Sequence, residues 1–263
     1  MVYICSRTKI TFQLRYFIEL SYKGTNYHGW QVQPDCISVQ ELINKSLSTI
    51  LRKPFAVLGA GRTDTGVHAE QMFAHFDIEN EIDVNETTYK LNSLLPHDIV
   101  IDKIFRTNDS VHARFDATSR SYEYRIFLGR NPFLIDTTWQ LNNKELNIVK
   151  MNEAAEILLT YTDFKSFSRV HTDVKTYNCD VREAKWIFNN KILTFHITAD
   201  RFLRNMVRAI VGTLVDVGTG KTNIEEFKQI LDSRDRCKAG TSAPAHGLFL
   251  TQVTYPKTNF IYE

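Results

Sequence analysis

The sequence contains little cysteine and no recognisable metal-binding pattern. Its 263 residues include only four cysteines, and no two of them form a Cys-x-x-Cys pair. This spacing predicts reduced thiols rather than a disulfide framework. The eight histidines form no His-x-x-x-His pattern and no mixed Cys/His pattern. The sequence therefore implies no metal site.

Long apolar runs and a strong excess of charge are absent as well. No stretch approaches the roughly 20 apolar residues that cross a bilayer. The first nine residues lack the charged start and apolar stretch of a signal peptide, so we expect a cytoplasmic protein with no membrane partner. Lysine and arginine number 32 against 30 acidic residues, a net charge of +2. Only local clusters of basic residues can therefore indicate a polyanionic partner.

The same order of predicted elements occurs twice along the chain. In the first part, apolar patterns and helix caps predict strands at 14–22, 55–58, 70–78 and 99–105 and helices opening at Ser38 and Asn85. In the second part they predict strands at 120–128, 181–188, 192–198 and 248–255, helices at 144–160 and 202–217, and a shorter inserted helix at 224–231. The two hairpin strands are joined at Asn189-Asn190. Each part therefore has the order β-α-β-β-α-β.

This repeated order predicts an α+β fold made of two tandem ferredoxin-like units. We expect the two units to form a mostly antiparallel central sheet with helices on one face. The expected boundaries are 14–112 for the half that carries a glycine-rich loop and 113–263 for the second half. Residues 1–13 form an extension before the first predicted strand.

The glycine-rich loop is the strongest candidate for a chemical site. Gly59, Gly61 and Gly66 surround Arg62-Thr63-Asp64 between two predicted strands. Glycine permits positive φ angles and close backbone approach. The loop has no Gly-Lys-Ser/Thr, a strand rather than a helix follows it, and Asp64 would repel a phosphate. The pattern is therefore better suited to presenting a carboxylate than to binding phosphate, and a turn without chemical function is the alternative.

The loop and four further stretches resemble one known family. Residues 61–69, Gly-Arg-Thr-Asp-Thr-Gly-Val-His-Ala, resemble the catalytic signature of the TruA family of tRNA pseudouridine synthases. The other matches follow in family order at 22–31 (Tyr-Lys-Gly-Thr-Asn-Tyr-His-Gly-Trp-Gln), 119–124, 202–208 and 244–248. Thr65 stands where the family usually has alanine, which leaves Asp64 unchanged. Residues 1–13 precede the usual start of the family.

The resemblance implies an isomerase that converts uridine to pseudouridine at positions 38, 39 and 40 of the tRNA anticodon stem-loop. Such enzymes use no metal and no nucleotide or other cofactor, and they typically act on tRNA as homodimers. Asp64 would be the catalytic carboxylate. The sequence leaves open whether it attacks C1′ of the sugar or C6 of uracil, or whether the route is glycal-like.

Further site residues follow from the resemblance and from strand and helix geometry. Arg201, Arg204 and Arg208 are spaced for one face of the predicted helix, where a solvated basic face is the alternative. The resemblance makes Arg208 the partner of Asp64 and leaves Arg201 and Arg204 for phosphate. Tyr122 matches the tyrosine that stacks on the flipped target base, although many strand tyrosines belong to the core. The remaining substrate candidates are Leu248, which would close the other side of the base, and Arg62. The candidate RNA-backbone contacts also include Arg234, Arg236 and Lys238.

Two other classes of protein compete with this interpretation. Two split β-α-β units with strand aromatics also resemble a non-catalytic RNA-binding protein. That alternative lacks an Arg/Lys-Gly-Phe-Gly-Phe motif and gives Asp64 no role. A phosphoryl-transfer enzyme is disfavoured because the glycine-rich loop lacks the lysine and metal ligands of that class.

Overall fold

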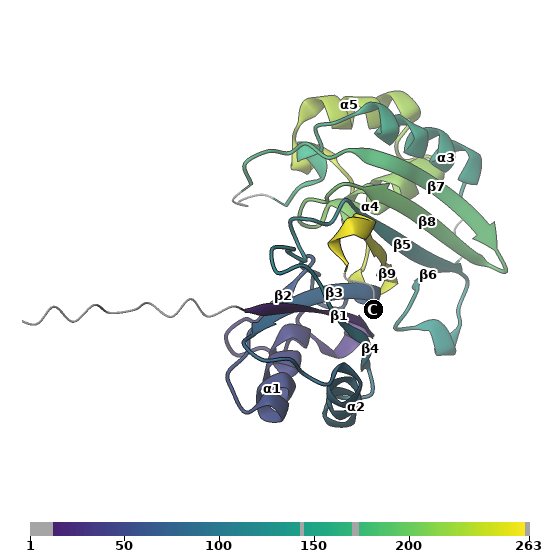
Figure 1. Cartoon of the computed structure of the whole chain (residues 1–263). Coiled ribbons are helices and arrows are strands. Elements are labelled where there is room, and N and C mark those ends of the chain that lie inside the picture. The colour runs from purple at the N-terminus through teal and green to yellow at the C-terminus, as the bar shows by residue number, and fades with distance from the viewer. Residues whose placement is uncertain (1–12, 143–144, 170–173, 261–263) are drawn as a thin grey trace, which may run out of the picture.

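A computed structural model describes residues 13–142, 145–169 and 174–260. These residues form one sheet of nine strands and five α-helices (Figure 1). The strands are β1 Leu14–Tyr22, β2 Leu58–Gly59, β3 His68–Ile78, β4 Ile99–Arg106, β5 Ser119–Leu128, β6 Trp139–Leu141, β7 Val181–Asn189, β8 Ile192–Ala199 and β9 Leu248–Thr254. The helices are α1 Val39–Leu51, α2 Val84–Leu94, α3 Ile148–Ile157, α4 Met206–Gly218 and α5 Ile224–Ser233. Residues 1–12 of the expected extension lie outside the described residues.

The sheet is mostly antiparallel, as predicted. Its strand order is β4-β1-β3-β9-β5-β8-β7, with β2 paired to β3 and β6 paired to β5. Only two of these pairs are parallel in the described structure, β3 with β9 and β5 with β6. In Figure 1, α1 and α2 lie beside the strands of the first half, α3 lies beside β7, and α5 packs on α3 and α4. The large mixed α and β architecture is therefore confirmed.

Local chemistry explains where several predicted boundaries are wrong. The strand expected at 55–58 is reduced to Leu58–Gly59, because the backbone N–H groups of Phe55 and Val57 bond to the side chains of Ser48 and Asn44 in α1 instead of a strand. The side chain of Asp83, not Asn85, caps α2 by accepting from the backbone N–H of Glu86. These bonds between side chains and backbone compete with the hydrogen bonds of strands and helices. The sequence pattern alone does not indicate which side chains form them.

In the second half, two turn positions differ from expectation. The hairpin between β7 and β8 turns at Asn190-Lys191, both with positive φ angles (49° and 66°), which fits a tight hairpin turn. Helix α4 begins at Met206 instead of residue 202, because Asn205 adopts a left-handed conformation with φ of 65°. The three-residue strand β6 was not predicted and pairs parallel to β5.

Two hydrophobic cores lie along the sheet, and β9 contributes to both. Leu248 belongs to the core under α3, α4 and α5, whereas Leu250 and Val253 belong to the core under α1 and α2. Val67, which follows the glycine-rich loop, packs in the core of the second half. Because each half inserts side chains into the other, the glycine-rich loop is held at their junction.

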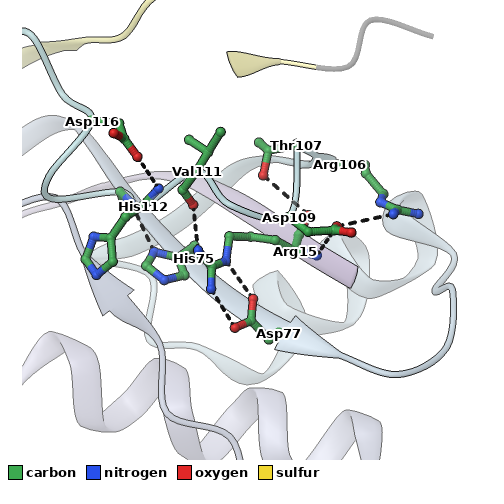
Figure 2. Close-up of polar contacts among 10 residues, drawn as sticks. Arg15, His75, Asp77, Arg106, Thr107, Asp109, Val111, His112 and Asp116 are labelled. Atoms are coloured by element: carbon green, nitrogen blue, oxygen red, sulfur yellow. Dashed lines mark hydrogen bonds and ion pairs between the residues drawn. The ribbon is translucent and has the colours of Figure 1, made fainter. Parts of the chain in front are cut away.

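The segment between β4 and β5 is fixed to the first half by polar contacts (Figure 2). Arg15 of β1 makes a bidentate ion pair with Asp77, both distances being 2.7 Å, and donates to the carbonyl of Val111 at 2.9 Å. The backbone N–H of Ala113 donates to Nδ1 of His75 at 3.1 Å. His75 is only 2% exposed, and burial lowers the pKa of its imidazole to about 4. The ring is therefore a neutral acceptor at neutral pH.

Membrane-spanning helices and metal-binding clusters are absent from the described residues, 13–142, 145–169 and 174–260. No helix in them is long and apolar enough to cross a membrane. No group of three histidine, cysteine, aspartate or glutamate residues in them could hold a metal ion. Cys36, Cys179 and Cys237 are free thiols, and Cys5 lies outside the described residues.

Candidate active site

The glycine-rich loop is held by the segment that follows β1. The backbone N–H of Trp30 donates to the carbonyl of Thr63 at 3.3 Å, and the N–H of Gly66 donates to the carbonyl of Tyr27 at 3.3 Å. The hydroxyl groups of Tyr22 and Thr63 are 3.0 Å apart. These contacts fix both sides of Asp64 and leave its side chain partly exposed, at 28%.

Glycine at position 29 makes this close contact between the two segments possible. Gly29 has a φ of +82°, and a Cβ atom there would lie 2.3 Å from the carbonyl oxygen of Thr63. That distance is far below ordinary van der Waals contact, so a larger residue would displace the backbone beside Asp64. The position falls in the matched stretch 22–31, yet its structural role depends on a contact that the sequence does not display.

His68 connects the loop to the chain that enters β9. Its Nδ1 accepts from the backbone N–H of Gly24 at 2.9 Å, which leaves Nε2 as the donor to the carbonyl of His246 at 3.1 Å. Burial lowers the pKa of His68, so the neutral tautomer is favoured. The histidine therefore acts as a structural link beside the loop, a role that the sequence analysis missed.

Two arginines face the carboxylate of Asp64. Nη1 of Arg208 lies 3.4 Å from Oδ2, and Nε of Arg204 lies 3.8 Å from Oδ1. The Nε of Arg208 also donates to the carbonyl of Ala243 at 2.7 Å, which fixes the guanidinium. Both distances to Asp64 exceed the 2.7–2.9 Å typical of tight charge-assisted hydrogen bonds. The carboxylate thus lies in a positive environment without being fully engaged by it.

The predicted helical face of three arginines is wrong. Arg201 and Arg204 precede α4, because the left-handed Asn205 separates them from Arg208 in the first turn. The side chain of Arg204 nevertheless reaches Asp64. Arg201 points elsewhere, with Nη1 3.5 Å from the carbonyl of Thr176.

Tyr122 lies on β5 beside this group. Its ring packs edge-on against Phe202, with ring centroids 5.1 Å apart. Burial raises the pKa of the Tyr122 phenol to about 12, and the negative charge of Asp64 acts in the same direction. The phenol is therefore protonated at neutral pH. Tyr124, on the same face of the strand, is fully buried and donates to the carbonyl of Pro244 at 2.7 Å.

The other candidate residues lie at varying distances from this centre, and within the described residues none of them forms a hydrogen bond or ion pair with Asp64. Leu248 is buried at the start of β9 opposite Tyr124. Arg62 and Lys238 are exposed. Arg234 lies 3.1 Å from Asp163. The side chain of Arg236 donates to the carbonyl of Gly240 and the hydroxyl of Ser242, and Ser242 accepts from the side chain of Asn205.

The arrangement combines a carboxylate, two guanidinium groups and a protonated phenol at the junction of two halves. A carboxylate that keeps free lone pairs can act as a nucleophile or a base, the arginines can stabilise negative charge, and the phenol can donate a proton. The aromatic ring of the phenol also offers a surface on which a planar base can stack.

Comparison with known proteins identifies the class to which this arrangement belongs. Residues 154–256 match the family model described as tRNA pseudouridine synthase. The protein named tRNA pseudouridine synthase A from Bacteroides fragilis is 53% identical over 94% of this chain and 98% of its own length. The proteins of that name from Parabacteroides distasonis and Bacillus licheniformis are 50% and 38% identical, over 95% and 90% of this chain and 99% and 97% of their own lengths. The chain belongs to the tRNA pseudouridine synthase A family.

Proposed function

We propose that this protein isomerises uridine to pseudouridine in tRNA, with Asp64 as the catalytic carboxylate. The observation that carries the proposal is the position of Asp64 on the glycine-rich loop, which backbone hydrogen bonds hold in place. The carboxylate oxygens of Asp64 lie 3.4 Å from Nη1 of Arg208 and 3.8 Å from Nε of Arg204. The names of the relatives support the tRNA substrate. The site itself supports the reaction, because the required groups are an ionised carboxylate and a proton donor.

In the proposed reaction the bond from N1 of uracil to C1′ breaks and a bond from C5 to C1′ forms, while C5 loses its proton and N1 gains one. Asp64 acts on C1′, on C6 or through a glycal-like route. Tyr122 supplies the stacking surface for the flipped uracil, a contact worth about 1–3 kcal/mol per base. Its protonated phenol donates a proton during the isomerisation. Arg208 orients the carboxylate.

For the substrate we propose uridines 38, 39 and 40 of the anticodon stem-loop. Leu248 and Arg62 complete the pocket around the base in this proposal. The phosphate backbone is met by basic side chains, namely Arg201, Arg204, Arg234, Arg236 and Lys238. The exposure of Arg204, Arg234 and Lys238 supports this assignment.

We also propose two tandem ferredoxin-like halves, 14–112 and 113–263, with helices on one face of the sheet. The neighbouring strands support it: β4-β1-β3-β2 in the first half and β9-β5-β8-β7 in the second have the same order of equivalent elements. The enzyme would act in the cytoplasm as a homodimer and without a cofactor.

Tritium release tests the reaction and its position together. A tRNA transcript labelled at C5 of uridine, with a single uridine among positions 38–40, is incubated with the enzyme. The expected result is release of one tritium per tRNA, and loss of release when that uridine is replaced by cytidine. Release that persists after the replacement would contradict the position. No release from a panel of unmodified tRNAs, with binding preserved, would favour the non-catalytic RNA-binding alternative.

A further inference from the structure

Arg120 connects three backbone segments near the proposed active site. It lies on β5 and on the same face of the strand as Tyr122. Its Nη1 donates to the carbonyls of Ala117 at 3.0 Å and Asp200 at 2.8 Å, and its Nη2 donates to those of Ala60 at 3.1 Å and Arg114 at 2.6 Å. One planar guanidinium therefore satisfies four carbonyls from three segments, and two of these carbonyls lie 60 and 80 residues from Arg120 in the sequence.

Two of these carbonyls belong to the segments that carry the reacting charges. Ala60 lies in the glycine-rich loop that presents Asp64, and its backbone N–H is held by the carbonyl of Phe73 at 2.7 Å. Asp200 follows β8 and begins the segment that leads to Arg204. Its backbone N–H is held by the carbonyl of Asp180 at 3.2 Å. Arg120 thus joins the glycine-rich loop that carries Asp64 to the segment that carries Arg204.

The electrostatics of Arg120 are unusual for a structural arginine. Burial lowers the pKa of Arg120, and no ion pair joins it to a carboxylate within the described part of the chain. Arg120 is half-buried, and a partly buried cation without an ion pair is costly unless it is hydrogen-bonded. A lysine could not replace it fully, because three donors on one nitrogen cannot span four carbonyls as a planar guanidinium does. The site therefore requires the shape of arginine as well as its charge.

We propose that Arg120 is a positioning residue that sets the placement of Asp64 relative to Arg204 and presents both to a base stacked on Tyr122. The proposal rests on the proposed isomerase function. Its action is indirect, because its contacts are with backbone carbonyls of the two segments. Without Arg120, the carbonyls of Ala60 and Asp200 would lose their shared donor, while the backbone N–H groups of these residues would keep their bonds to Phe73 and Asp180.

The test compares Arg120→Met and Arg120→Lys with Arg15→Met as a matched control. Arg15 is also partly buried and also donates to a backbone carbonyl, that of Val111, but its side chain contacts β3 and the segment between β4 and β5 and leaves the loop of Asp64 untouched. The measurements are single-turnover tritium release at saturating tRNA, tRNA affinity, melting temperature and amide hydrogen exchange of residues 59–67. Rescue of Arg120→Met by added guanidinium is compared with an equal concentration of sodium chloride.

We expect Arg120→Met to lower the single-turnover rate about 100-fold, the loss typical of a misplaced catalytic group. Affinity for tRNA should stay near wild type, exchange in residues 59–67 should accelerate, and guanidinium should restore part of the rate. Arg120→Lys should fall between Arg120→Met and wild type. Arg15→Met should lower the melting temperature while retaining the wild-type rate and wild-type exchange in the loop.

A wild-type rate in folded Arg120→Lys or Arg120→Met would overturn the proposal, as would unchanged exchange in residues 59–67. If Arg120→Met does not fold, Arg120→Lys decides. Absence of tritium release in the wild-type enzyme would instead refute the isomerase function. In that case hydrogen exchange alone decides whether Arg120 anchors the loop.

Discussion

Replacing Gly29 by alanine should displace the backbone that carries Asp64. Gly29 has a φ of +82°, and the new Cβ would lie 2.3 Å from the carbonyl oxygen of Thr63 and 3.1 Å from the carbonyl carbon of Asp64. Both neighbours are backbone atoms, so neither can rotate away as a flexible side chain would. The two segments must separate by several tenths of an ångström, and the separation occurs at the residue that presents the carboxylate.

The expected cost has two parts. An L-residue at positive φ costs about 1–2 kcal/mol, and the lower entropy of alanine in the unfolded chain offsets about 0.4–1 kcal/mol of it. Steric overlap in a packed site adds about 1–3 kcal/mol. A displacement approaching 1 Å at a reacting group can reduce turnover about 100-fold. We therefore expect Gly29→Ala to lose stability and, more severely, single-turnover activity.

Gly220→Ala is the control variant. It places alanine at a positive φ angle, as Gly29→Ala does, but it should not displace neighbouring atoms. Gly220 has a similar φ of +76°, follows the end of α4, and has no atom within 4 Å of the position of a Cβ. The free energy of unfolding of this variant, measured in urea, should fall by about 1 kcal/mol or less. Its rate of tritium release should equal that of the wild type. If Gly29→Ala retained the same activity as Gly220→Ala, the contact between Gly29 and Thr63 would not position Asp64, and the reasoning would be refuted.

Two further predictions concern titratable groups. Tyr122→Phe should keep the stacking surface but lose the phenol proton, lowering the single-turnover rate about 100-fold with little change in tRNA affinity; unchanged rates would remove the phenol from the chemistry. Burial lowers the pKa of His75 to about 4 in the folded protein, below the unfolded value of about 6.5, so the contribution of His75 to the free energy of unfolding should fall by about 3 kcal/mol as the pH drops from 6.5 to 4. In His75→Gln this pH dependence should weaken, as urea unfolding at several pH values would show; a profile identical to wild type would contradict the lowered pKa.

The regular elements were predictable because their patterns are local. The alternation in residues 14–22 and the Ser38 cap before 39–51 are encoded within a few residues, and the structure has both. The short strand β6 escaped prediction because three residues carry too little pattern. The predicted start of α4 at residue 202 was wrong because Asn205 adopts a left-handed conformation, which the neighbouring sequence does not predict.

The candidate site was predictable only where the family resemblance named its residues. The structure brings Asp64, Arg208 and Arg204 together, as the resemblance implied for the first two. Arg120 and Gly29 were not identified, since their partners are backbone carbonyls that any residue type supplies. Such contacts depend on the three-dimensional path of the chain, so neither spacing nor composition reveals them.

Loss of the Asp64 carboxylate is the most direct test of the central claim. Asp64→Asn and Asp64→Ala should abolish tritium release from labelled tRNA and leave tRNA binding largely intact. Asp136→Asn is the matched control, because Asp136 is half exposed and pairs with Lys23 at 3.0 Å, outside the proposed machinery. It should release tritium at the wild-type rate. Release near that rate by either Asp64 variant would contradict the assignment of Asp64 as the catalytic carboxylate.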